Sequence, residues 1–323
     1  ARRWRCASAL SFCVRESELL HRIAERSAGM AAAFPHVLLG PGDDCAAVRP
    51  PGGAMLLTVD QVIERRHFVP GTPLDLVARK AVARSISDLA AMGATPWCAL
   101  ATGALPAGFP QADADALCVS IKKWAENWNC PLVGGDLASL PEPTSPLMLT
   151  VTAIGVAHAS GHVATRGGAK PGDHVYVTGA LGGSLDRATG MGRHLTFEPR
   201  VREAAWLLDT FGTRVHAMID LSDGLGRDAS RIAEASRVRL ELDAEAIPRH
   251  GGVDDWRAAA GDGEDYELLV CIDPACAVPA LIQSTGTRLT RVGSVAPGAG
   301  CVVQDGADVH DVRAVGWDHN GRP

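Results

Sequence analysis

Two short apolar segments of this chain each lead directly into an aspartate, one in each half of the sequence. Met55–Val59 precedes Asp60, and Val215–Ile219 precedes Asp220. Segments of this kind are typical of strands, and stretches with the three- and four-residue apolar spacing of helices alternate with them along the chain. The alternation predicts an α/β (α+β) fold in which helices pack against sheets.

The other expected elements continue this alternation. Expected helices cover 16–28, 73–92, 112–128, 201–210 and 223–235, and expected strands cover 97–105, 131–133, 147–156, 174–178, 266–272 and 289–295. The strand at 131–133 is expected to stop at the sequence Gly134-Gly135-Asp136, because glycine pairs interrupt strands.

The length of 323 residues suffices for two domains. The Gly/Ala-rich loop at 159–172 is the best boundary between them. We therefore expect a flexible tail at 1–15, an N-terminal α/β domain at 16–157 and a C-terminal α/β domain at 158–323.

Composition and charge exclude several classes of protein. A net charge of −6 disfavours a nucleic-acid-binding surface. The longest uncharged run, 89–112, contains three prolines that would break a membrane-spanning helix. The nine cysteines include no C-x-x-C pair, so they indicate neither a zinc ribbon nor a disulfide framework and fit a reduced cytoplasm. We expect a cytoplasmic protein without nucleic-acid or membrane partners.

Acidic residues beside glycines, or at the ends of expected strands, are the strongest functional signal. Asp88 is the most informative, because a carboxylate inside the otherwise apolar helix 73–92 is costly to bury unless it is paired or bound to metal. The others have plain alternatives. Asp43 and Asp44 suit a Gly/Pro turn, whereas Ser222 with Asp223 suits a helix N-cap.

If these carboxylates converge, their negative charges require cations. Oxygen ligands without Cys or His point to Mg²⁺, Mn²⁺ or Ca²⁺. Mg²⁺ completes its coordination with water and substrate phosphates, so several aspartates beside a polyphosphate would form an ATP site. The acidic residues concerned are Asp43, Asp44, Asp60, Asp88, Asp136, Asp220, Asp223, Glu264 and Asp265.

The familiar ATP-binding motifs are absent from the sequence. No Gly-Lys pair exists, which excludes a P-loop, and the H-R-D and D-F-G kinase motifs are missing. Arg166, within Thr-Arg-Gly-Gly, could clamp a phosphate instead, although a solvated loop arginine suits the spacing equally. His67 either faces an anionic substrate or lies in an exposed turn. Trp317 either stacks on a flat ring or packs against the protein.

Eight segments of the chain carry a specific pattern: LGPGDDCA (39–46), TVDQVIERRHF (58–68), RKAVARSISDLAAMGATP (79–96), VGGD (133–136), TRGGAKPGDHVYVTG (165–179), IDLSDGL (219–225), GDGEDYELL (261–269) and GWDH (316–319). In this order, they together resemble the thiamine-monophosphate kinase family, within the wider group of aminoimidazole-ribonucleotide and selenophosphate synthetases. The resemblance runs from about residue 16 to 319.

The resemblance implies phosphorylation of thiamine monophosphate to thiamine diphosphate, the last step of thiamine diphosphate biosynthesis. The implied cofactors are several Mg²⁺ ions, with ATP as co-substrate. The implied architecture is a two-domain aminoimidazole-ribonucleotide-synthetase-like fold and a homodimer. Its N-terminal domain binds Mg-ATP and dimerises, and its C-terminal domain completes the substrate site. Since the attacking phosphate oxygen is already anionic, no general base is needed and the transfer is expected to be direct and in line.

The family's functional residues carry over to matching positions of this chain. The implied metal ligands are Asp44, Thr58, Val59, Asp60, Asp88, Asp136, Asp220 and Asp223, of which Asp44, Asp60, Asp88, Asp136 and Asp220 are also the implied catalytic residues. The implied ATP contacts are Gly135, Asp136, Arg166 and Ser222, and the implied contacts to thiamine phosphate are His67, Glu264 and Trp317.

Three features depart from the family pattern. Val59 replaces a hydroxyl residue, so only its backbone carbonyl could bind metal; segment 194–200 lacks the usual Arg-Pro after its histidine; and GWDHN replaces a terminal Phe. Three alternatives stay open. They are another ATP-dependent synthetase of the group with a different acceptor, a non-catalytic nucleotide or thiamine-phosphate sensor, and a structural protein with acidic turns.

Overall fold

The computed structural model describes residues 16–41 and 46–317. The first half contains α1 (Glu16–Arg26), α2 (Met30–Ala33), β1 (Val37–Leu39), β2 (Ala47–Val48), β3 (Met55–Ile63), α3 (Leu74–Ala91), β4 (Thr95–Leu105), α4 (Gln111–Asn127), β5 (Leu132–Ser139) and β6 (Met148–Val156). The second half contains β7 (His174–Thr178), α5 (Val201–Phe211), β8 (Val215–Asp220), α6 (Leu225–Ser236), β9 (Arg239–Asp243), α7 (Trp256–Gly261), β10 (Leu268–Ile272), β11 (Leu281–Ile282), β12 (Thr287–Ala296), β13 (Gly300–Asp305) and β14 (Asp308–Asp311), with short 3-10 turns at Arg193–Leu195 and Gly212–Arg214.

The chain forms two compact units. Among the described residues, the first comprises 16–41, 46–50, 59–82 and 98–152, and the second comprises 51–58, 83–97 and 153–317. Elements β3, α3, β4 and β6 therefore contribute residues to both units. The mixed helix-and-sheet architecture confirms the α/β (α+β) class expected from the sequence.

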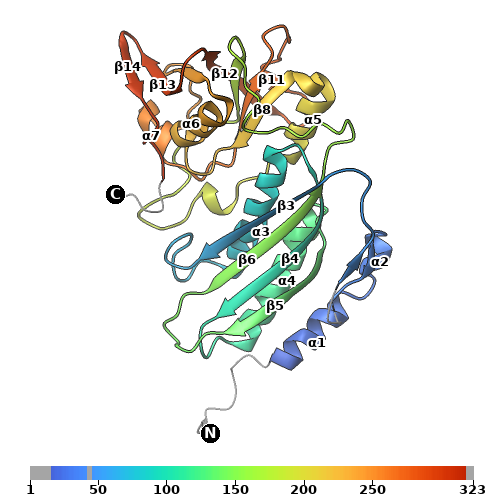
Figure 1. Ribbon diagram of the computed structural model, residues 1–323. Helices are drawn as coiled ribbons and strands as arrows, with labels where there is room; N and C mark the ends of the chain where they lie inside the picture. Colours follow the sequence, from blue (N-terminus) through green and yellow to red (C-terminus); the bar gives the residue numbers. More distant parts are fainter. Residues whose placement is uncertain (1–15, 42–45, 318–323) are drawn as a thin grey trace. The chain divides into compact units, whose positions relative to one another are not determined.

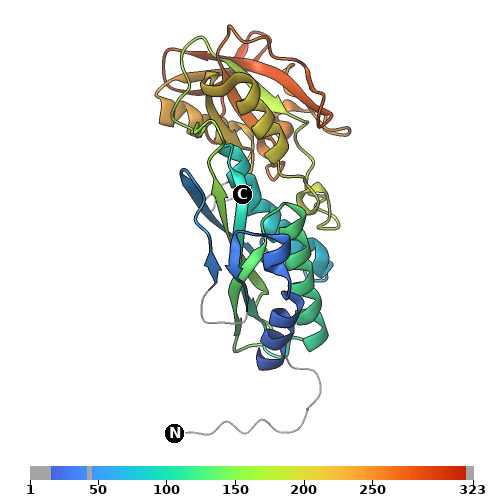
Figure 2. The same ribbon diagram turned by 90° about the vertical axis from the view of Figure 1, so that its right-hand side faces the viewer.

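A four-stranded sheet with the order β3-β6-β4-β5 organises the first half. Helices α3 and α4 pack on one of its faces (Figure 1), and Figure 2 shows them to one side of the strands. The contact is close, because a Cβ on Gly155 of β6 would lie 3.0 Å from a Leu89 methyl of α3. Along β3, buried Leu56 alternates with exposed Leu57 and Val59, as expected for a strand with one covered face.

Two strands extend beyond the ends expected from the sequence. β3 continues through Asp60 to Ile63, and β5 continues through Gly135 and Asp136 to Ser139. For β5 the cause is its parallel pairing with β4, which runs from Ala99↔Leu132 to Leu105↔Ser139. The hydrogen bonds of the partner strand override the weak strand propensity of glycine. Asp60 and Asp136 thus lie within strands, whereas Asp220 ends its strand as predicted.

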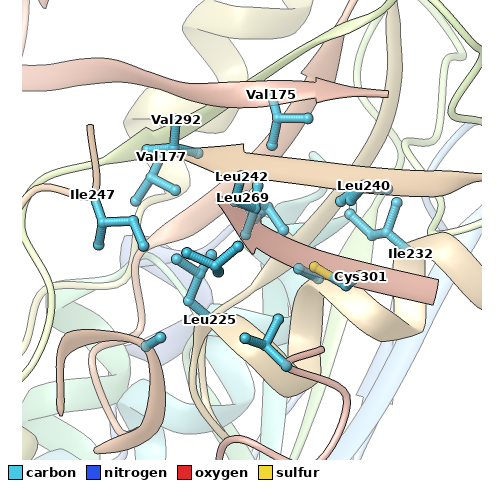
Figure 3. Close-up of a cluster of buried hydrophobic side chains, with 14 of the residues drawn as sticks. Val175, Val177, Leu225, Ile232, Leu240, Leu242, Ile247, Leu269, Val292 and Cys301 are labelled. Atoms are coloured by element: carbon cyan, nitrogen blue, oxygen red, sulfur yellow. The ribbon is translucent and has the colours of Figure 1, made fainter. Parts of the chain in front are cut away.

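An eight-stranded sheet organises the second half, in the order β14-β13-β9-β12-β7-β10-β8 with β11 paired to β12. Its central strands are buried on both faces. On one face, Val175, Val177 and Leu269 pack against Leu225 and Ile232 of α6 (Figure 3). On the other face, alternate residues of the same strands pack against α5. The sheet fixes the end of β8, from which Asp220 projects, beside the start of β10.

Candidate functional site

Asp88 and Thr58 form a direct pair in the second unit. Asp88 lies on α3, and the Thr58 hydroxyl on β3 donates a hydrogen bond to its Oδ2. Burial raises the pKa of the Asp88 carboxyl, and this effect outweighs the hydrogen bond from Thr58 and the charges of Arg84 and Arg166. A carboxylate that is costly to ionise here would gain from a bound cation.

Asp220 is tied to the same turn of α3. The Ser87 hydroxyl donates a hydrogen bond of 2.7 Å to Oδ2 of Asp220, and both residues are buried. Ser87 and Asp88 are consecutive on α3, so Asp220 contacts the helix turn that carries Asp88, and the charge of Arg166 acts on Asp88. Four of the residues implied from the sequence, Thr58, Asp88, Arg166 and Asp220, therefore gather in one unit.

Asp60 and Asp136 belong to the first unit, on the two edge strands of the four-stranded sheet. Two strands separate them, which corresponds to about 14 Å along the sheet. Within residues 16–41 and 46–317, no group of three or more His, Cys, Asp or Glu side chains is placed to hold one metal ion. Asp44, another implied ligand, lies outside the described residues.

His67 lies in a tight turn that follows β3. The Ile63 N–H donates to His67 Nδ1 at 2.9 Å, and Lys80 Nζ, fully buried on α3, donates to the His67 carbonyl at 2.7 Å. Since a backbone N–H can only donate, the neutral ring accepts at Nδ1 and carries its proton on Nε2. The turn therefore sets both the position and the tautomer of His67.

Backbone hydrogen bonds join four other implied residues in the second unit. The Trp317 N–H donates to the Asp223 carbonyl, and the Glu264 N–H donates to the Ser222 carbonyl, each at 2.8 Å. The Asp223 side chain pairs with Arg231 at 2.5 Å, while the Trp317 side chain is half exposed. Ser222 and Asp223 do not cap α6: its N-cap is Gly224, with no side-chain capping bond.

The segment around Glu264 has an unusual backbone. Both Glu264 and Tyr266 have φ of 54°, in the left-handed region that non-glycine residues seldom occupy. The Glu264 carboxylate lies 3.1 Å from Nδ1 of buried His194, and the Tyr266 ring stacks on Phe197. Such strain concentrates at functional sites, because surrounding contacts must maintain it.

Two buried acids follow Glu264 in this segment, of which the sequence singled out Asp265 as a possible cation ligand but not Glu267. Glu267 forms a two-pronged ion pair with Arg200, with N–O distances of 2.7 and 2.5 Å. Asp265 accepts hydrogen bonds from the Gly182 N–H and the Ser184 hydroxyl. The signal for both was the alternation of charged and aromatic residues directly before an apolar strand. These bonds anchor the chain on both sides of Tyr266.

Gly135 has a structural reason to be glycine. A Cβ there would lie 1.9 Å from the Ala101 carbonyl oxygen of the neighbouring strand β4. Gly168, two residues after Arg166, likewise allows its loop to lie against β8, since a Cβ would lie 1.9 Å from the His216 carbonyl oxygen. Both glycines permit close backbone approach.

The donor atoms of this site suit a hard cation. Asp88, Asp220 and Thr58 offer only oxygen, the ligand type that Mg²⁺ takes, and Mg²⁺ needs few protein carboxylates when phosphates complete its coordination. Asp220 thus bonds to the turn of α3 that carries Asp88, and the charge of Arg166 acts on Asp88, a combination that suits binding of a metal–polyphosphate complex.

Two family models match the chain, one in each half. The family AIR synthase related protein, N-terminal domain, matches residues 42–157, and AIR synthase related protein, C-terminal domain, matches residues 170–306. A thiamine-monophosphate kinase of Rhodopirellula baltica is 37% identical over 287 residues, covering 83% of this chain and 86% of the relative.

Solved structures agree with this result. The crystal structure of thiamine-monophosphate kinase from Stenotrophomonas maltophilia is 30% identical, with a TM-score of 0.76 over 92% of this chain and 98% of that one. The structure of AaThiL complexed with AMPPCP and TMP is 26% identical, with a TM-score of 0.71 over 96% of this chain and 100% of that one.

Proposed function

This chain belongs to the thiamine-monophosphate kinase family, and we propose on that basis that it transfers the γ-phosphate of ATP to thiamine monophosphate, forming thiamine diphosphate. The observation that carries this function is the similarity to a thiamine-monophosphate kinase over 83% of the chain. A relative of the same fold binds AMPPCP and TMP together. The pairing of Asp88 with Thr58, and of Asp220 with Ser87, provides the acidic residues for such chemistry.

The reaction requires no covalent bond between the protein and the transferred phosphate. A phosphate oxygen of thiamine monophosphate attacks the γ-phosphorus while the bond to the β-bridging oxygen breaks, so ADP leaves directly and no phosphoenzyme forms. Both reactants are anions, and catalysis depends on aligning them and neutralising their charge. A general base is unnecessary because the nucleophile already carries negative charge.

Asp88, Asp220 and Thr58 hold Mg²⁺ in this proposal, together with the other implied ligands. Bound Mg²⁺ supplies charge neutralisation at the transferring phosphate. The wide separation of Asp60 and Asp136 along their sheet favours several ions over one. Those other implied ligands are Asp44, the Val59 carbonyl, Asp60, Asp136 and Asp223.

Arg166, with Gly135, Asp136 and Ser222, contacts ATP in this proposal. His67, Glu264 and Trp317 contact thiamine monophosphate. The hydrogen bond from the Ile63 N–H fixes the neutral His67 ring with Nε2 as its donor. Nε2–H is then suited to a phosphate oxygen, and the half-exposed indole of Trp317 to a flat heterocycle.

One assay tests this function. The protein is incubated with Mg-ATP and thiamine monophosphate, and thiamine phosphates are separated by chromatography, with controls lacking Mg²⁺ or acceptor. We expect thiamine diphosphate and ADP in equal amounts, both dependent on Mg²⁺. ADP without thiamine diphosphate would indicate that the acceptor is that of a related synthetase and not thiamine monophosphate. Binding of ATP without any product would favour a sensor.

The homodimer is supported by an exposed apolar sheet face. Leu57 and Val59 of β3 are 67% and 61% exposed, and Met55 and Leu100 project from the same sheet. Exposed apolar side chains gathered on one sheet are characteristic of interaction surfaces, and a second copy of this sheet would cover them. In light scattering after gel filtration, Leu57→Asp should yield monomers. Val309→Asp, at an equally exposed site on β14, should remain dimeric. A dimeric Leu57→Asp variant would contradict this interface.

A cytoplasmic location is supported by the thiols. The cysteines among the described residues, Cys98, Cys118, Cys130, Cys271, Cys276 and Cys301, are all free. Burial raises the pKa of Cys98 and of Cys118 to about 11, so neither is a reactive thiolate at neutral pH. No helix in the described part of the chain is long and apolar enough to span a membrane. Thiol titration without reductant should find these six cysteines unpaired.

A further inference from the structure

The loop that carries Arg166 is held against β8 along its length. The Met218 N–H of β8 donates to the Thr165 carbonyl at 3.1 Å. Three residues later, Gly168 lies so close to the His216 carbonyl that no side chain would fit. Arg166 lies between these two contacts, and its charge acts on Asp88. The direction of the Arg166 side chain therefore depends on the hydrogen bonds that hold the backbone of this loop.

The hydroxyl of Ser236 links two backbone groups of this loop. Ser236 Oγ donates to the Arg166 carbonyl at 2.8 Å and accepts from the Ala169 N–H at 3.1 Å. It thus substitutes for a backbone bond between two peptide groups that do not bond each other directly. Among polar side chains, a hydroxyl can donate to a carbonyl and accept from an N–H with the same atom.

Ser236 is well placed for this role because α6 holds it rigidly. It is the last residue of α6, one turn after the fully buried Ile232 and Ala233. Arg237 then ends the helix with φ of 57°. Gly167 approaches the same helix end, since a Cβ there would lie 3.3 Å from the Ala235 carbonyl oxygen.

We propose that Ser236 is a positioning residue for ATP binding, which holds Arg166 in the direction needed to contact the nucleotide phosphates. The proposal rests on the ATP role given to Arg166 above. In this proposal α6 positions residues at both of its ends. Its first turn follows Asp223, and its last residue, about 18 Å along the axis, holds Arg166.

Steady-state kinetics test this role with three variants at the same helix. Ser236→Ala should raise KM for ATP about fivefold, the effect of one lost hydrogen bond, with a smaller change in kcat. Ser236→Thr retains the hydroxyl and should restore most of the affinity. Ser230→Ala is the matched control, because the Ser230 Oγ donates to the Gly226 carbonyl of its own helix. It should leave KM unchanged.

A double variant separates positioning from general damage. In an Arg166→Ala background, Ser236→Ala should add no further loss of ATP affinity. In the single variant Ser236→Ala, hydrogen exchange of the Ala169 amide should be faster than in the wild type. Additive losses, or an unchanged KM in Ser236→Ala, would overturn the proposal. If the wild-type protein makes no thiamine diphosphate, the proposed function fails instead. An active enzyme whose Arg166→Ala variant binds ATP normally overturns only the positioning role.

Discussion

Ser87 Oγ donates a hydrogen bond of 2.7 Å to Asp220 Oδ2, and this buried bond joins α3 to the end of β8. A hydrogen bond to a carboxylate contributes about 1.5–3 kcal/mol. We therefore expect Ser87→Ala to lower the free energy of unfolding by about that amount and to reduce kcat, since Asp220 loses the donor that orients it. Urea denaturation and the thiamine diphosphate assay measure the two effects. Ser230→Ala, which removes the bond to the Gly226 carbonyl within α6, should change neither property as much, and equal effects would contradict the role of Ser87.

Asp88→Asn should nearly abolish turnover while the protein stays folded. The amide keeps the size of the side chain and can still accept from Thr58, but it removes the negative charge that holds a cation. Circular dichroism checks the fold and the phosphorylation assay checks turnover across a range of Mg²⁺ concentrations. Asp75→Asn, in the first turn of the same helix and paired with Lys123 at 3.0 Å, is the matched control and should remain active. Retention of most activity by Asp88→Asn would count against its metal role.

The sequence allowed prediction of α3, because its apolar spacing is a local signal, and the carboxylate within it made Asp88 a candidate ligand. The extent of β3 and β5 was wrong, because β5 continues through Gly135 only by pairing with β4. The strands β9, β13 and β14 were not predicted at all. Each is short, and β9 and β13 pair in parallel across a separation of about 60 residues, which local patterns do not encode.

For the site, too, local features could be predicted and long-range contacts could not. The aspartates were visible as residues beside glycine or after strands, but the bond between Ser87 and Asp220 spans 133 positions. No local pattern therefore indicates the role of Ser87. The left-handed backbone of Glu264 and Tyr266 was also hidden, since neither residue type favours that conformation.

Lys80→Met should weaken binding of thiamine monophosphate. Lys80 is fully buried, and its Nζ donates a 2.7 Å hydrogen bond to the carbonyl of His67. Methionine fills similar space without a donor, so the turn that presents His67 loses a restraint. We expect KM for thiamine monophosphate to rise about fivefold, with KM for ATP unchanged. Lys122→Met, which breaks a surface pair with Glu126, provides the control. Equal rises in both KM values would indicate general damage instead.

Asp265→Asn should change the pH dependence of stability. Burial raises the pKa of Asp265 from 3.8 to about 6, although Ser184, the Gly182 N–H and Arg193 favour the ionised form. The folded protein therefore binds this proton more tightly than the unfolded chain. The resulting stability is complete below pH 3.8 and is lost as pH rises through about 6. Between pH 4.5 and 7.5, the wild type should lose roughly 2 kcal/mol more than Asp265→Asn. Urea denaturation at several pH values measures this, and a constant difference would contradict the shift.

Gly135→Ala tests why this glycine is present. Its Cβ would lie 1.9 Å from the Ala101 carbonyl oxygen, so β4 and β5 would have to separate, at a cost of about 1–3 kcal/mol. The adjacent Gly134→Ala is a sharp control, because its Cβ would meet only the flexible end of Leu100, at 3.2 Å. We expect thermal denaturation to show a lower Tm for Gly135→Ala and a much smaller change for Gly134→Ala. A Gly135→Ala protein of normal Tm that had lost ATP affinity would show instead that the glycine serves nucleotide approach and not strand pairing.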